Sequence, residues 1–106
     1  MIEVVFDQEK MSVLATGHAG SAPKGEDLVC AGVTTLVLTL ADNVECMKEA
    51  GMVEQSAVSI QEGVARIMCI PNPEYAHVVE LVFRSICRGF SGLAAANPQY
   101  MVYGVG

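Results

Sequence analysis

The sequence is poor in basic residues. Six Lys and Arg stand against twelve Asp and Glu, which gives a formal net charge of −6. This sign is wrong for a sequence-independent grip on phosphates, so we expect neither nucleic acid nor an anionic membrane as a direct partner. An acidic body instead favours the approach of a basic ligand or a basic protein segment through long-range electrostatic steering.

Signals for export and membrane insertion are also missing. Residues 1–10 alternate apolar and polar side chains and lack the basic and apolar regions of a secretory signal. We therefore expect the mature protein to start at or near Met1. The longest uncharged run, residues 28–41, is 14 residues long and contains three threonines. It is too short and too polar for a bilayer span, so a cytoplasmic protein without a membrane helix is expected.

The four cysteines lack the spacing of a metal site. They are separated by 16, 23 and 18 positions, and no Cys-x-x-Cys element occurs. A structural zinc site is therefore not expected, and neither is any other metal or cofactor. Without an export signal, we expect reduced thiols in the cytosol. Cys46, Cys69 and Cys87 lie on apolar patterns and are interpreted as core residues.

Apolar residues are abundant. The hydrophobic share is 52% and the charged share 17%, a balance that excludes a disordered chain. The 106 residues suffice for a single domain, residues 1–106, with no room for a second. A core of this size gives only marginal stability, so a partner subunit would help.

Alternation of apolar and polar residues predicts two β-hairpins and a last strand. Residues 2–6 and residues 11–16 form the first hairpin. Residues 56–60 and 64–70 form the second, around a turn at residues 61–63. A short strand at residues 100–103 closes the sheet.

Two helical patterns complete the chain. Asp27 is predicted to cap the first helix, and Gly51 to end it. The apolar residues at helical spacing in this helix are Val33, Leu36, Leu40, Val44 and Met47. Its first half is apolar on nearly every side, so it should be deeply buried or covered by another subunit. Asn72 caps the second helix, which ends at Asn97, and its apolar stripe is Val78, Val82, Ile86, Phe90 and Leu93.

The order of elements is ββαββα(β). It predicts an α+β fold of two layers, with a mixed or antiparallel sheet of four to five strands and two helices packed on it.

Chain-breaking residues are concentrated between the first hairpin and the first helix. Within residues 17–26 they are Gly17, Gly20, Pro23 and Gly25. This density predicts a mobile loop of about ten residues without regular structure. Glycine-rich loops beside helix starts are common places for functional sites, so we interpret this one as a substrate loop.

His18 and Cys30 flank this loop and form the candidate site. If Asp27 is the N-cap, Cys30 lies in the first helical turn, where unpaired amides and the helix dipole stabilise an anion. A nearby imidazolium would also favour the nucleophilic thiolate, and His18 is close enough in sequence to supply it. Asp27 is first a cap and second a candidate for orienting His18.

Plainer roles compete with these. Most cysteines in apolar runs are small buried hydrophobes, and a histidine at a strand end can be purely structural. His77, near the start of the second helix, is interpreted as a surface or packing residue.

Residues 17–36 read GHAGSAPKGEDLVCAGVTTL. This stretch resembles the signature of the ribosomal-processing cysteine protease family Prp, in which a Gly-His-Ala element precedes an Asp-(Ile/Leu)-Val-Cys-Ala element. The Gly-Phe-x-x-Leu pattern from Gly89 to Leu93, followed by Asn-Pro-Gln-Tyr, looks like the ending of the family. The resemblance therefore spans essentially the whole chain.

The resemblance implies a bacterial cytoplasmic endopeptidase that acts as a homodimer. The resemblance also implies that this enzyme trims a short N-terminal extension from the large-subunit ribosomal protein numbered twenty-seven. In such an enzyme the thiolate of Cys30 would attack the scissile carbonyl, and first-turn amides such as those of Cys30 or Ala31 would meet the oxyanion. His18 would protonate the leaving amine, and the loop would close over the peptide.

Two alternatives from other classes stay open. The first is a non-catalytic dimeric adaptor in ribosome assembly, which predicts ordinary reactivity for the Cys30 thiol. The second is a thiol redox protein, which predicts a reversible disulfide, although no second cysteine lies near Cys30 in the sequence.

Overall fold

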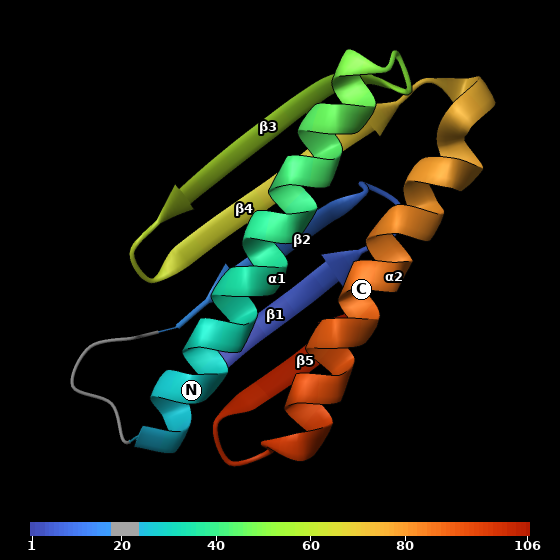
Figure 1. Ribbon diagram of the computed structural model, residues 1–106. Coiled ribbons are helices and arrows are strands. Elements are labelled where there is room, and N and C mark those ends of the chain that lie inside the picture. Colours follow the sequence, from blue (N-terminus) through green and yellow to red (C-terminus); the bar gives the residue numbers. More distant parts are fainter. Residues whose placement is uncertain (18–23) are drawn as a thin grey trace.

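The computed structural model describes residues 1–17 and 24–106, with side chains omitted for residues 24–27. Within this part, a sheet of five strands carries two helices on one face (Figure 1). The elements are β1 (Ile2–Asp7), β2 (Ser12–Thr16), α1 (Lys24–Glu49), β3 (Val53–Gln61), β4 (Val64–Pro71), the short 3-10 helix η1 (Pro73–Tyr75), α2 (Ala76–Ala96) and β5 (Met101–Val105). The predicted α+β class and order of elements are confirmed.

The sheet is mixed, with strand order β3-β4-β2-β1-β5. Three of its pairings are antiparallel, and the fourth, between β1 and β5, is parallel and places Ile2 opposite Met101. The last strand begins one residue later than predicted and runs on to Val105. In consequence β3 and β5 form the two edges of the sheet.

Local hydrogen bonds explain where the hairpins and α1 end. The carboxylate of Asp7 accepts hydrogen bonds from the amides of Glu9 and Lys10, each at 3.1 Å, and so fixes the β1–β2 turn. At the end of α1 the amide of Met52 donates to the carbonyl of Met47 at 2.8 Å. This bond closes a Schellman-type ending around Gly51, as the sequence predicted.

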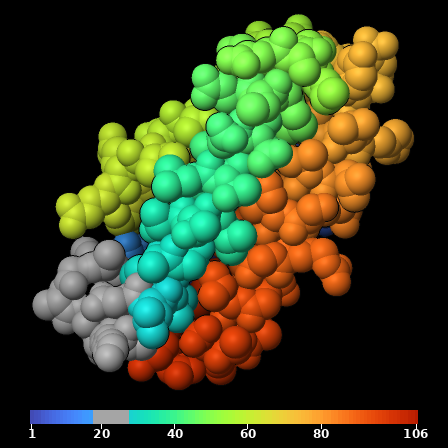
Figure 2. All heavy atoms as spheres, in the orientation of Figure 1, coloured from blue at the N-terminus to red at the C-terminus, as the bar shows by residue number. Residues whose placement is uncertain are grey.

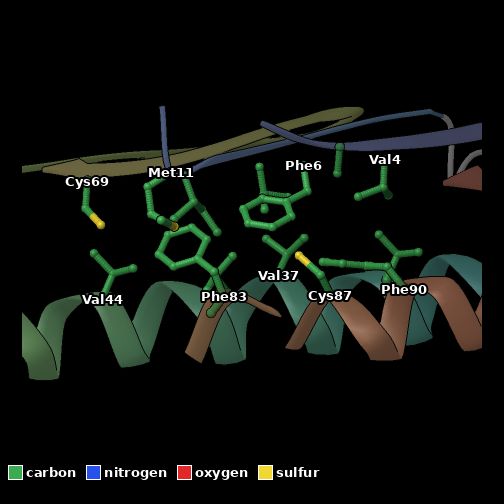
Figure 3. Packing of buried hydrophobic residues seen from close by; sticks show 14 of the residues in the cluster. Val4, Phe6, Met11, Val37, Val44, Cys69, Phe83, Cys87 and Phe90 are labelled. Atoms are coloured by element: carbon green, nitrogen blue, oxygen red, sulfur yellow. The ribbon is translucent and has the colours of Figure 1, made fainter. Parts of the chain in front are cut away.

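The core lies between the sheet and the helices (Figure 3). Side chains from the sheet point down toward the helices, and side chains of α1 and α2 point up to meet them. The rings of Phe6 on β1 and Phe83 on α2 stack with centroids 6.0 Å apart. The labelled members of this layer are Val4, Phe6, Met11, Val37, Val44, Cys69, Phe83, Cys87 and Phe90.

The buried side of α2 differs from the predicted stripe. Its buried residues are Val79, Phe83, Cys87 and Phe90. Of the predicted set, Phe90 is buried, whereas Val78 is exposed and Val82, Ile86 and Leu93 are half-buried. The predicted helix start needs correction too. The side chain of Asn72 makes no capping hydrogen bond and instead donates to the carbonyl of Gly51.

One side of α1 packs on the sheet, and the other faces outward. The buried residues are Val29, Val33, Val37, Leu40, Val44 and Met47. On the outer side, Leu28 and Leu38 remain 68% and 53% exposed, so this chain does not bury the first half of α1 on all sides. By length and composition alone, Leu28–Glu49 could cross a membrane. Its inner side is apolar because it forms the core.

The two helices approach each other closely at small residues. A Cβ atom on Gly89 of α2 would lie 2.7 Å from the Cδ2 atom of Leu36 on α1. A Cβ atom on Gly32 of α1 would lie 3.0 Å from the Cδ1 atom of Leu93 on α2. Glycine at both positions therefore lets a leucine from the opposite helix fill the space between them.

Candidate functional site

The first helix starts earlier than the sequence suggested, and this changes the setting of Cys30. Because α1 begins at Lys24, Asp27 is the fourth residue of the helix and not its N-cap. Cys30 is then the seventh residue, in the second turn. The predicted first-turn position for Cys30 is wrong, and the amides of Cys30 and Ala31 lie in the helix interior, beyond the unpaired first four. The predicted oxyanion donors are therefore not available there.

Cys30 nevertheless lies in a pocket. The residue is half-buried and lines an open hollow of about 110 Å³. Three parts of the chain meet there. On α1, Val33 and Thr34 follow Cys30 in the lining of this pocket. The start of β1 supplies Ile2, and Gly17 follows the end of β2. The β3–β4 hairpin supplies residues on both sides of its turn.

The end of β2 is anchored to the β3–β4 turn. The amide of Gly17 donates a hydrogen bond to the carbonyl of Gly63 at 3.0 Å. Gly17 has φ +147°, and a Cβ atom there would lie 2.9 Å from the Cα atom of Ile2. Only glycine fits this conformation and this close approach without strain. The chain thus leaves β2 from a fixed point on the pocket wall.

The structure describes some of the predicted site residues and not others. Gly17 and Cys30 line the same pocket. His18 and Gly20 lie outside the described residues. Gly25 is the second residue of α1, so the predicted loop over residues 17–26 is too long, because residues 24–26 are helical. His77 lies exposed in the first turn of α2 and does not line the Cys30 pocket.

The other three cysteines have different surroundings. Cys69 and Cys87 are buried, as predicted, and burial raises the pKa of the Cys69 thiol to about 11. Burial also raises the pKa of Cys87, a shift that a hydrogen bond with Tyr103 opposes. Cys46 is exposed, which corrects the prediction of a core residue. None of the four cysteines, all of which lie in the described part of the chain, forms a disulfide with another.

The structure adds pocket residues that were not predicted from the sequence. Thr34 lies one helical turn after Cys30 and lines the same pocket. Its spacing of four residues from Cys30 could have identified it, because residues at that spacing share a helix face. Gly63 and its neighbours could not be found in this way, because only the pairing of β2 with β4 brings that turn to the pocket. Among the described residues, no group of three or more His, Cys, Asp or Glu is placed to hold a metal ion.

Comparisons with known proteins agree with this fold. The family model described as cysteine protease Prp matches residues 1–102. A Streptococcus mutans protein, SMU.848, has a TM-score of 0.69 and 25% identity, over 98% of this chain and 90% of that one. Two structures of the ribosomal processing protease Prp from S. aureus also match. The complex with a covalently linked product peptide has a TM-score of 0.73 and 18% identity, over 100% of both chains. The complex with a substrate peptide has a TM-score of 0.72 and 14% identity, over 99% of this chain and 97% of that one. A comparison with curated proteins gives no match.

Proposed function

Because the chain belongs to the cysteine protease Prp family and is a cysteine protease, we propose that Cys30 is its nucleophile and His18 its proton carrier. One observation carries this proposal: Gly17 and Cys30 line one pocket. His18 directly follows Gly17 in the sequence, and consecutive Cα atoms are about 3.8 Å apart, which supports a role for His18 beside the thiol.

The chemistry follows from this pair. The thiolate of Cys30 attacks the scissile carbonyl carbon, and the imidazolium of His18 gives its proton to the leaving amine as the C–N bond breaks. Water then attacks the thioester, and the imidazole takes a proton from it. The second product leaves as a carboxylic acid that ionises, and the thiolate is restored. Since Cys30 lies in the second helical turn, the thiolate depends on His18 more than on the helix dipole, which acts mainly at the first turn.

The proposed substrate is the precursor of the large-subunit ribosomal protein numbered twenty-seven, cut after its N-terminal extension. The S. aureus structures support a peptide substrate, since that protein is a ribosomal processing protease solved with a substrate peptide and with a covalently linked product peptide. Ribosomal proteins are basic, and the net charge of −6 favours their approach. We place this reaction in the cytoplasm, where ribosomal proteins are made.

We further propose a homodimer that covers the outer side of α1. Leu28 and Leu38 are the large apolar residues exposed there, and burying such side chains in an interface is favourable. Sedimentation analysis should give twice the mass of the chain for the native protein. Leu38→Glu should shift it toward the monomer. A native monomer at micromolar concentration would contradict this proposal.

Cleavage of the precursor tests the proteolytic function. The native chain should remove the extension, and Cys30→Ala should leave the precursor intact. The far-UV circular dichroism spectrum of Cys30→Ala should equal that of the native chain, which shows that the variant is folded. Cleavage by Cys30→Ala would contradict the assigned nucleophile. If neither protein cleaves and Cys30 alkylates no faster than Cys46, the peptide-holding adaptor becomes the better interpretation.

A further inference from the structure

A second hollow lies beyond the Cys30 pocket, between the C-terminal half of α1 and the edge strand β3. Its volume is about 710 Å³. Ala41 and Val44 line it from α1, and Ser56 and Val58 line it from β3. Figure 2 shows α1 along the front of the molecule, with β3 on one side and α2 on the other.

The two hollows follow one another along the same pair of elements. Val37 and Ile60 line the Cys30 pocket. Ala41 comes one helical turn after Val37, and Val58 is the next residue of β3 on the same face as Ile60. Val58 and Ile60 face the helix layer but remain 45% and 43% exposed, because α1 does not extend over them. An apolar floor therefore runs from Cys30 to the second hollow.

The outer edge of β3 has no strand beside it in the described structure. Val53–Gln61 is nine residues long and pairs with β4 on its inner side. An unpaired edge of this length is a template for an extended peptide, which adds as a further strand through main-chain hydrogen bonds. An occupant of the groove would thus be extended and would run along β3.

Charge indicates what kind of extended peptide fits. Asp42, Glu45 and Glu49 line the rim from α1, and Lys48 stands among them. Three carboxylates against one ammonium group leave the rim net negative. A peptide that places Lys or Arg over this part of the groove complements both the charge and the apolar floor.

We propose that this groove binds the part of the substrate that follows the scissile bond and selects for basic residues there. The inference rests on the proposed protease function. A strand added antiparallel to β3, the commoner pairing, runs from Gln61 toward Val53, and so carries the chain from Cys30 toward the acidic rim.

Helix geometry gives the expected positions of the basic residues. Asp42 and Glu49 lie about 18 Å and 28 Å along α1 from Cys30 at about 1.5 Å per residue. An extended peptide advances about 3.3 Å per residue. The selected Lys or Arg should therefore lie about five to nine residues after the scissile bond.

Peptides that contain the precursor's cleavage junction test the groove. One carries lysine six and nine residues after the scissile bond, the second carries glutamate at both positions, and a shortened third ends three residues after the bond. The native chain should cleave the lysine peptide with a kcat/KM about fivefold above that of the glutamate peptide, as two exposed ion pairs would give, with the difference mainly in KM. The variant Asp42→Asn/Glu45→Gln/Glu49→Gln should lose most of this preference.

A matched variant controls for overall charge. Glu3→Gln/Glu9→Gln/Glu74→Gln removes three charges outside the groove and should keep the preference. Equal kcat/KM for the two long peptides with the native chain, or equal losses in both variants, would overturn the groove while cleavage of the short peptide upholds the protease. If no peptide is cleaved, the protease function fails, and binding of the long peptides to Cys30→Ala still decides the groove by the same preference.

Discussion

The amide of Gly17 and the carbonyl of Gly63 are joined by a hydrogen bond of 3.0 Å, which ties the end of β2 to the β3–β4 turn. Gly63 also leaves room for the end of β2, since a Cβ atom on Gly63 would lie 3.3 Å from the carbonyl oxygen of Gly17. Both residues line the pocket of Cys30. The point at which the chain leaves β2, at Gly17, is therefore set by a contact with the distant β3–β4 turn.

Gly17→Ala should destabilise the protein and impair cleavage. Its φ of +147° is unfavourable for alanine, and the new Cβ atom would lie 2.9 Å from the Cα atom of Ile2. Backbone strain of this kind costs about 2 kcal/mol, which urea unfolding would measure. Gly104→Ala is the control, because nothing lies within 4 Å of a Cβ atom there. Equal free energies of unfolding for Gly17→Ala and Gly104→Ala would contradict the requirement for glycine at position 17.

Gly89→Val should weaken the contact between the helices. A Cβ atom at this position already comes within 2.7 Å of the Cδ2 atom of Leu36, so two further methyl groups require the helices to move. Overpacking typically costs about 1–3 kcal/mol. Gly92→Val, in the same helix but with open space around the Cβ position, carries the same change in helix propensity. We expect the free energy of unfolding of Gly89→Val to be lower than that of Gly92→Val by this amount.

The buried side of α2 shows how far periodicity alone reaches. Val78, Val82 and Ile86 repeat at helical spacing, and so do Val79, Phe83 and Cys87, one residue later in each case. Both sets fit an amphipathic helix, so the sequence predicts the helix but not which set meets the sheet. The larger Phe83 ring, stacked on Phe6, lies on the side that is buried.

The start of α1 shows a second limit. Glu26 and Asp27 are acidic residues, and a carboxylate can stabilise a helix either as its cap or from any position in its first turn. The sequence therefore indicates a helix start near Asp27 without fixing the residue. The helix starts four residues earlier than an Asp27 cap would place it, at Lys24 instead of Leu28, and this moves Cys30 out of the first turn. The pairing of Gly17 with the Cys30 pocket was nevertheless predictable in outline, since a strand end and a helix joined by a short segment must stay close.

Stability should decline at high pH because Cys69 is buried. Its thiol has a pKa raised from the ordinary value of 9.0 to about 11, so the unfolded chain loses this proton more readily than the folded one. The contribution to stability is complete below pH 9 and is lost as the pH rises toward 11. Urea unfolding at pH 8 and pH 10.5 should show a smaller decline for Cys69→Ala than for the native chain. Cys46→Ala, which removes an exposed thiol, should keep the native decline.

The reactivity of Cys30 should depend on His18. Because α1 begins at Lys24, Cys30 lies beyond the turn in which unpaired amides and the helix dipole stabilise an anion most. In the proposed mechanism, the imidazolium of His18 is then the main group that favours the thiolate. Alkylation of Cys30 by iodoacetamide at pH 7 should slow by about tenfold in His18→Ala. This corresponds to an activation free energy raised by about 1.4 kcal/mol. Mass analysis of each cysteine supplies the reference, since exposed Cys46 should react at one rate in both proteins. An unchanged rate at Cys30 would assign the activation of the thiol to the helix and leave His18 only the transfer of a proton to the leaving amine.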